Sequence, residues 1–126
     1  MKPSFVRMRK RWRAVLVVPS HLSDLAPHLR RKNFYPFVLP AGVLDEQQKK
    51  LLLPHRTLIT DKPEEFDADD VPVLEFSLID ITLVKADEAA MADMISRAWT
   101  TFRLKSEGWF VLRLRQNGKH QIEFPE

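Results

Sequence analysis

The sequence contains no cysteine among its 126 residues. This absence excludes disulfides, thiolate metal sites and a cysteine nucleophile, and it suits a cytoplasmic location, where disulfides are rare. With only three glycines, the sequence has no Gly-rich phosphate loop, no dinucleotide fingerprint and no Gly-x-Ser-x-Gly nucleophile turn. Since no apolar run approaches the roughly 20 residues that a transmembrane helix requires, we expect no membrane contact.

The charge of the chain is distributed unevenly. The net charge is +3, yet residues 1–56 carry 12 Lys/Arg and 3 Asp/Glu (net +9), whereas residues 57–126 carry 8 and 14 (net −6). The first 13 residues form a basic leader in which Phe5 and Trp12 are interleaved. Because basic residues bind phosphates and aromatic rings stack on bases, this leader is a candidate RNA-binding segment. The alternative is a loosely docked tail that is basic for solubility.

Apolar runs and helical periodicity alternate along residues 14–126 and predict one α/β domain. Strands are expected where β-branched and aliphatic residues form short runs, and helices where apolar residues recur every three or four positions. The expected order is a strand at 14–18, a helix at 21–32, a strand at 34–39, a helix from Asp45, a strand at 57–60, one or two strands within 71–84 and a helix at about 88–104. Such an alternation is typical of a mostly parallel sheet with right-handed crossovers.

Local signals indicate where several of these elements begin and end. Ser23 or Asp24 is a candidate N-cap of the first helix, Asp45 of the second and Asp87 of the last. The chain is expected to close with a β-hairpin formed by residues 109–115 and 119–124. Its turn is expected at Asn117-Gly118, a pair that favours a type I′ turn.

The stretch after residue 56 joins a short apolar strand to a dense group of carboxylates. The strand at 57–60 is followed by six acidic residues, Asp61, Glu64, Glu65, Asp67, Asp69 and Asp70. In open α/β sheets ligands bind at the carboxyl ends of strands, and hard divalent cations prefer carboxylate oxygens. One interpretation is therefore a site for a divalent cation, and the other is a solvated acidic loop. Asp80, in the next apolar segment, is a candidate interior-facing acid.

Three short sequence motifs occur in order along the chain. The first follows an expected strand, the second begins a helix with an acidic cap, and the third is a strand followed by an acid. They are Val-Val-Pro19-Ser20-His21-Leu22, Leu-Asp45-Glu-Gln-Gln, and Leu-Ile-Thr60-Asp61-Lys62-Pro63-Glu64-Glu65-Phe66. With the late helix and the closing hairpin, they resemble the PIN-like nuclease domains, specifically the small toxin ribonucleases of toxin–antitoxin systems. The likeness runs over most of residues 14–124. It implies a three-layer PIN-like domain with a mostly parallel central sheet.

The resemblance also implies an activity, which is RNA cleavage by Mg²⁺ or Mn²⁺ held at the carboxyl edge of the sheet. Asp45 and Asp61 match the family's catalytic and metal-binding acids, with Glu64 or Glu65 as alternative metal ligands. The family's first-strand acid falls on Pro19, which cannot ligate a metal. Residues that would guide RNA lie in two basic groups, one in the leader and one at the end of the first helix: Arg9, Lys10 and Arg11, and Arg30, Arg31 and Lys32.

Three functions follow from these features. The first is a metal-dependent ribonuclease toxin that a partner antitoxin neutralises. The second is a non-catalytic PIN-like module that binds RNA or a protein partner through the same surfaces, and the third is an interaction subunit whose acidic residues 61–70 meet a basic partner. PIN-like proteins commonly pair, so Trp99, Phe102 and Trp109 are candidates for a homodimer interface, and burial in the chain's own core is the alternative.

Overall fold

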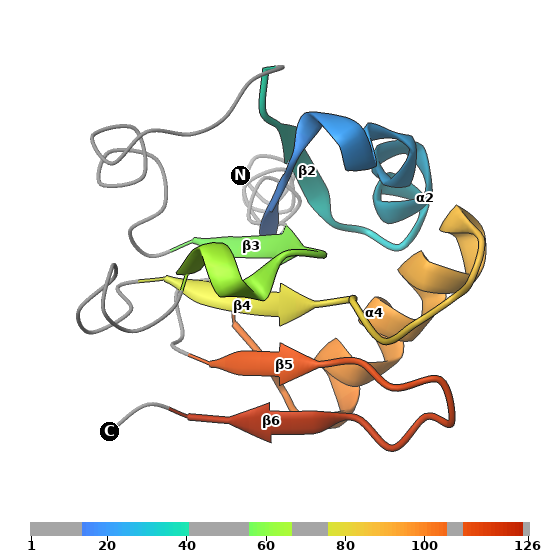
Figure 1. Ribbon diagram of the computed structural model, residues 1–126. Coiled ribbons are helices and arrows are strands. Elements are labelled where there is room, and N and C mark those ends of the chain that lie inside the picture. The colour runs from blue at the N-terminus through green and yellow to red at the C-terminus, as the bar shows by residue number, and fades with distance from the viewer. Residues whose placement is uncertain (1–13, 41–55, 67–75, 106–109, 125–126) are drawn as a thin grey trace, which may run out of the picture.

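The computed structural model describes residues 14–40, 56–66, 76–105 and 110–124 (Figure 1), apart from the side chains of Glu65 and Phe66. One sheet of six strands runs through these segments: β1 (Val15–Val18), β2 (Tyr35–Val38), β3 (Thr57–Thr60), β4 (Ser77–Asp80), β5 (Val111–Arg113) and β6 (Gln121–Glu123). The helices are the 3-10 helices η1 (Ser20–Leu25) and η2 (Pro63–Phe66) and the α-helices α2 (Ala26–Arg31) and α4 (Glu88–Thr101).

The order of the strands across the sheet is β2-β1-β3-β4-β5-β6. Every pair of neighbours is parallel except β5 and β6, which are antiparallel and form the C-terminal hairpin. The predicted mostly parallel α/β sheet with a closing hairpin is therefore confirmed. The leader at residues 1–13, the helix expected from Asp45 and Trp109 lie outside the described residues.

Both described α-helices pack on the same face of the sheet. Leu29 of α2 and Ile95 of α4 are fully buried in one cluster with strand residues of that face, which include Leu16, Val18, Ile59, Ile79 and Leu112. At the edge of this cluster the Trp99 ring makes edge-to-face contacts with Phe34 and Phe110, at centroid distances of 5.3 Å and 5.8 Å. Trp99 is therefore partly buried against the core of this chain, and the homodimer interface stays a prediction.

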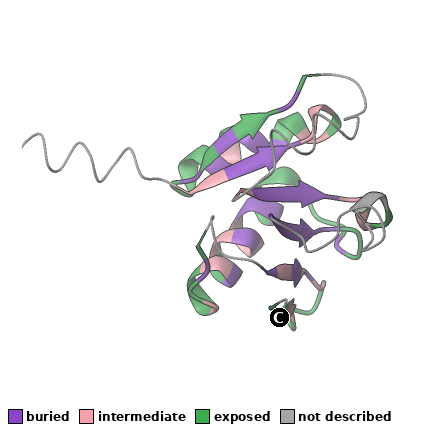
Figure 2. Ribbon diagram, turned by 90° about the vertical axis from the view of Figure 1, so that its left-hand side faces the viewer, coloured by how far each residue is buried: buried purple, intermediate pink, exposed green. Residues whose placement is uncertain are grey.

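The opposite face of the central strands is buried as well. Val17, Leu58 and Leu78 stand in register across β1, β3 and β4, and none is more than 4% exposed. Figure 2 shows the same burial along these strands. Burial on both faces explains why β1 is a continuous apolar run without alternation. The three-layer PIN-like arrangement stays a prediction, because both α-helices of the described residues lie on the other face.

The first helical region begins in a way that its capping residues do not predict. It starts as η1 and becomes α-helical at Ala26, where Leu25 occupies the N-cap position without a side-chain hydrogen bond. The assignment of Ser23 or Asp24 as N-cap is therefore wrong. Pro27 explains the late start, since a proline lacks the N–H of the helix interior and fits only the first turn. By contrast, Asp87 caps α4 as expected and accepts the N–H of Ala90 at 2.8 Å.

The turn of the C-terminal hairpin also differs from the expected type I′ turn. Gly118 has a φ of +77°, but Asn117 does not share the positive φ that a type I′ turn requires at both central residues. The Gly118 N–H instead donates to the Arg115 carbonyl at 3.1 Å, so the turn is formed by residues 115–118. The loop between β5 and β6 is longer than two residues, which removes the need for the I′ geometry.

The strand β2 forms one edge of the sheet and carries Pro36 in its middle. The N–H groups of Tyr35 and Leu39 donate to the carbonyls of Ala14 and Val18 on the β1 side, each at 2.8 Å. Because the residues of a strand point their backbone groups alternately to either side, Pro36 and Val38 face outward. A proline has no N–H, so the outer edge of β2 lacks a donor at its centre, which is a common protection of edge strands.

The helix α2 ends in a hydrogen-bonded turn that leads directly into β2. Asn33 has a φ of 71°, and its N–H donates to the Arg30 carbonyl at 3.0 Å. The N–H of Phe34 donates to the Leu29 carbonyl at 3.1 Å, which completes a Schellman motif and buries the Phe34 ring. The conformation of Asn33 therefore sets the direction in which the chain enters β2.

Replacing Asn33 by valine should destabilise the protein by about 1–2 kcal/mol, because a β-branched residue is strained at a positive φ. Urea denaturation followed by circular dichroism measures this change. The control is Arg30→Val, which lies at an exposed position of regular helix and should cost only about 0.5 kcal/mol through helix propensity. Equal losses in the two variants would show that the left-handed conformation at Asn33 carries no constraint.

Candidate functional site

The carboxyl ends of β1 and β3 lie side by side at the point where the chain changes direction across the sheet. From β1 the chain crosses through η1 and α2 to β2 on one side, whereas β3 is followed by β4 on the other side. Such a switch point is where open α/β sheets bind their ligands. Pro19 and His21 follow β1 at this place, and Asp61 follows β3.

A contact between His21 and Asp61 joins the two strand ends. The Nε2 atom of His21 lies 2.9 Å from Oδ1 of Asp61, and the two side chains are 51% and 36% exposed. The turn below Asp61 is held by Thr60, whose buried hydroxyl accepts the Lys62 N–H at 2.9 Å. An exposed pair of this kind adds little to stability. Its main effect is to hold an imidazole and a carboxylate together at the switch point.

A second carboxylate lies at the end of the neighbouring strand β4. Asp80 is buried, and its Oδ1 accepts both the N–H of Thr82 at 2.9 Å and the Thr82 hydroxyl at 2.5 Å. The same hydroxyl lies 3.3 Å from the backbone oxygen of Asp61. Thr82 therefore bridges the ends of β3 and β4. The resemblance did not assign Asp80 to the site. The sequence feature that indicates it is its place at the end of an apolar run.

The strand register places Asp80 in a polar row across the carboxyl edge of the sheet. Thr60 pairs with Asp80, and Asp80 pairs with Arg113 on β5. Residues in register on parallel strands point to the same face, so a basic side chain is the cross-strand neighbour of the buried carboxylate. The Arg113 guanidinium forms an ion pair with Glu123 on β6. Arg115 likewise donates to the Gln121 side chain at 2.6 Å, so both arginines of the hairpin make contacts between strands.

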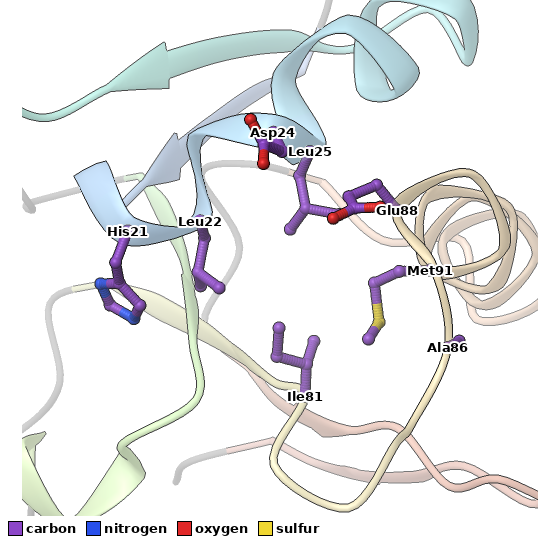
Figure 3. A pocket seen from close by; sticks show the side chains of 8 residues that line it. All are labelled: His21, Leu22, Asp24, Leu25, Ile81, Ala86, Glu88 and Met91. Carbon is purple, nitrogen blue, oxygen red and sulfur yellow. The ribbon is translucent and has the colours of Figure 1, made fainter.

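A small hollow lies beside this edge, between η1 and the start of α4 (Figure 3). It is lined by His21, Leu22, Asp24, Leu25, Ile81, Ala86, Glu88 and Met91. In Figure 3 the side chains of Leu22, Ile81 and Met91 point toward its centre. Its volume of about 130 Å³ is below the roughly 300–1,000 Å³ of small-molecule sites. The hollow is too small to hold a nucleotide.

Only part of the predicted metal site falls within the described residues. Asp61 stands at the expected edge, and Glu64 is exposed in η2, whereas Asp45 and the side chain of Glu65 lie outside the described part. In the segments that the structure describes, no group of three or more His, Asp and Glu side chains could hold a metal ion. Asp61 contacts a histidine instead of a second carboxylate, and the described residues by themselves do not complete a Mg²⁺ or Mn²⁺ site.

Of the two groups of predicted RNA-guiding residues, only the second can be placed relative to this edge. Arg9, Lys10 and Arg11 lie outside the described residues, whereas Arg30, Arg31 and Lys32 are exposed at the end of α2. The crossover returns the chain there to the amino end of the strands, where Tyr35 pairs with Val15. The basic group on α2 is therefore at the opposite edge of the sheet from Asp61.

One member of this basic group has an acidic partner on α4. The Lys32 Nζ atom donates to Asp93 Oδ1 at 2.9 Å, and Arg97 binds the other oxygen of the same carboxylate at 2.7 Å. The hydrogen bond from Lys32 is the main reason why the pKa of Asp93 lies below its ordinary value of 3.8. Lys32 therefore helps to fasten α2 to α4.

Comparison with profiles of known protein families, with curated proteins and with solved structures gives no match for this chain. Of the helices within the described residues, none is long and apolar enough to cross a membrane. Assignment of a function therefore depends on the chemistry of the strand ends and of the sheet surfaces.

Replacing Thr82 by valine should destabilise the protein by about 1–2 kcal/mol, because the buried Asp80 carboxylate loses a hydrogen bond from the hydroxyl. Urea denaturation at neutral pH measures the effect. The matched control is Thr82→Ser, which keeps the hydroxyl and should stay close to the wild type. If the serine and valine variants lose the same free energy, the hydroxyl does not support Asp80.

Proposed function

We propose that this chain is a PIN-like module that binds RNA without metal-dependent cleavage. The observation that carries the proposal is the His21–Asp61 contact at the switch point of the sheet. A divalent metal needs several oxygen ligands that converge on it. Here the carboxylate of Asp61 contacts an imidazole, and Pro19 stands where the resembled family has its first acid.

The charge of the chain supports RNA as the partner. Residues 1–56 carry a net charge of +9, and Arg30 and Arg31 are exposed at the end of α2. A phosphate backbone is attracted to such a surface because binding releases its condensed counterions.

Metal-dependent RNA cleavage is the second candidate function. It is favoured by the closeness of two carboxylate residues at adjacent strand ends, since the Thr82 hydroxyl contacts both the Asp80 side chain and the Asp61 backbone. The resemblance would add Asp45 to these two residues. A measurement of metal dependence separates the two candidates.

The purified chain should bind single-stranded RNA equally well in EDTA and in Mn²⁺, within about twofold, and should leave the RNA intact. Its affinity should fall steeply as the salt concentration rises, because phosphate contacts dominate binding. Fluorescence anisotropy with an end-labelled RNA measures the affinity, and a denaturing gel of the same samples detects cleavage.

The control variant for this experiment is Asp61→Asn. Cleavage that requires Mn²⁺ and disappears in this variant would replace the proposal by the second candidate. If the wild type binds no RNA even at low salt, both candidates are overturned and a protein partner becomes the better assignment.

A single substitution tests whether the fold places these strand ends as in the resembled family. Pro19→Asp restores the missing acid, and its metal binding should raise the melting temperature by a few degrees at saturating Mn²⁺. The wild type and the uncharged control Pro19→Asn should show no rise. The PIN-like interpretation of the strand ends is wrong if Mn²⁺ has no effect on the aspartate variant, or if it stabilises the asparagine variant equally.

A further inference from the structure

The face of the sheet opposite the described α-helices carries aromatic residues near its β2 edge. Tyr35 and Phe37 of β2 pair with Val15 and Val17 of β1. The pairing of Leu16 with Thr57 places Arg56 beside Val15 in the same row. Since residues in register point to the same face, the two aromatic rings and the arginine share one surface.

This surface is exposed where the rest of the face is buried. Tyr35 is 58% and Phe37 is 38% exposed, whereas Val17 and Leu58 in the adjoining positions are buried. The guanidinium carbon of Arg56 lies 5.9 Å from the centroid of the Phe37 ring. The two rings therefore present apolar surface to solvent next to a positive charge.

We propose that Tyr35, Phe37 and Arg56 form a stacking surface for single-stranded RNA. Aromatic side chains on a sheet stack on unpaired bases, and arginine contributes stacking and attraction to phosphate. Residues two positions apart on a strand are separated by about 7 Å, so each ring can stack on a different base. This inference rests on the proposed RNA-binding function and gives it a contact surface.

Charge favours RNA as the occupant of this surface. The parts of the two rows that surround this surface, Tyr35-Val15-Arg56 and Phe37-Val17-Leu58, contain no acidic residue, and Arg56 is basic. An extended peptide that added a strand to the β2 edge would lose a hydrogen bond at Pro36, which has no N–H. A duplex RNA would keep its bases stacked within its own helix, so the aromatic rings favour single-stranded RNA.

The experiment measures the affinity of the full chain for a fluorescein-labelled single-stranded RNA by anisotropy. The variants Tyr35→Leu and Phe37→Leu keep apolar bulk at each position but remove the ring. Each should weaken binding by roughly 5- to 150-fold, which corresponds to the loss of one base stacked on an aromatic ring. The matched control is Phe124→Leu, since Phe124 is 62% exposed and follows the strand at the opposite edge of the sheet.

The outcomes separate this inference from the function on which it rests. If the wild type binds RNA and both leucine variants bind it equally well, the stacking surface is overturned while RNA binding stands. If the wild type does not bind RNA, both the stacking surface and the proposed RNA-binding function are overturned. Equal affinity for a duplex RNA of the same length would also overturn stacking. Urea denaturation of each variant shows whether a loss of affinity reflects loss of the fold.

Discussion

The parallel pairing of β1 with β3 is the constraint on which both proposed surfaces depend. Leu16 pairs with Thr57 and Val17 with Leu58. At one end of this pair the register brings His21 to Asp61, and at the other end it brings Arg56 to the row of Tyr35. A shift of one residue would turn every side chain of β3 to the other face of the sheet, so that each face would bury the side chains that now lie on the opposite face. Two chemically different surfaces therefore depend on a single register.

The burial of the central strands explains why functional groups are found only at their ends and edges. All four residues of β3 and all four of β4 are buried. A buried polar group needs a partner inside the protein, as Asp80 shows with its two hydrogen bonds from Thr82. The polar groups that remain accessible therefore follow the last residue of a strand, where the chain turns toward solvent.

Much of the fold follows from local signals in the sequence, because its elements are short and clearly bounded. The run Thr57–Thr60 is flanked by a basic residue and by acids, so its limits as a strand are clear, and Asp87 caps α4 as its position predicts. The start of α2 was missed because Ser23 and Asp24 are both good caps, while Pro27 decides which of the possible starts the backbone can adopt. The turn at Asn117-Gly118 was missed because its type depends on the length of the whole loop.

The candidate site was harder to predict from the sequence than the fold, since it is built from contacts between residues that are distant along the chain. His21 and Asp61 are 40 positions apart, and each alone has the character of an ordinary surface residue. The exposure of Tyr35 and Phe37 depends on the place of β2 at the edge of the sheet, for which Pro36 within the strand is the local signal. The resemblance found Asp61 by its motif, but it could not show that a histidine would be its neighbour.

Pro36 also bears on the order in which the sheet is assembled. During synthesis the segment from β1 to β2 emerges before β3, so a newly formed pair of these strands has two open edges. On the outer edge of β2 the central residue offers no amide hydrogen, whereas the free edge of β1 has a complete set of backbone donors. The nascent pair is thus asymmetric as a template. The edge of β1, which has all its backbone donors, is the one that pairs with β3.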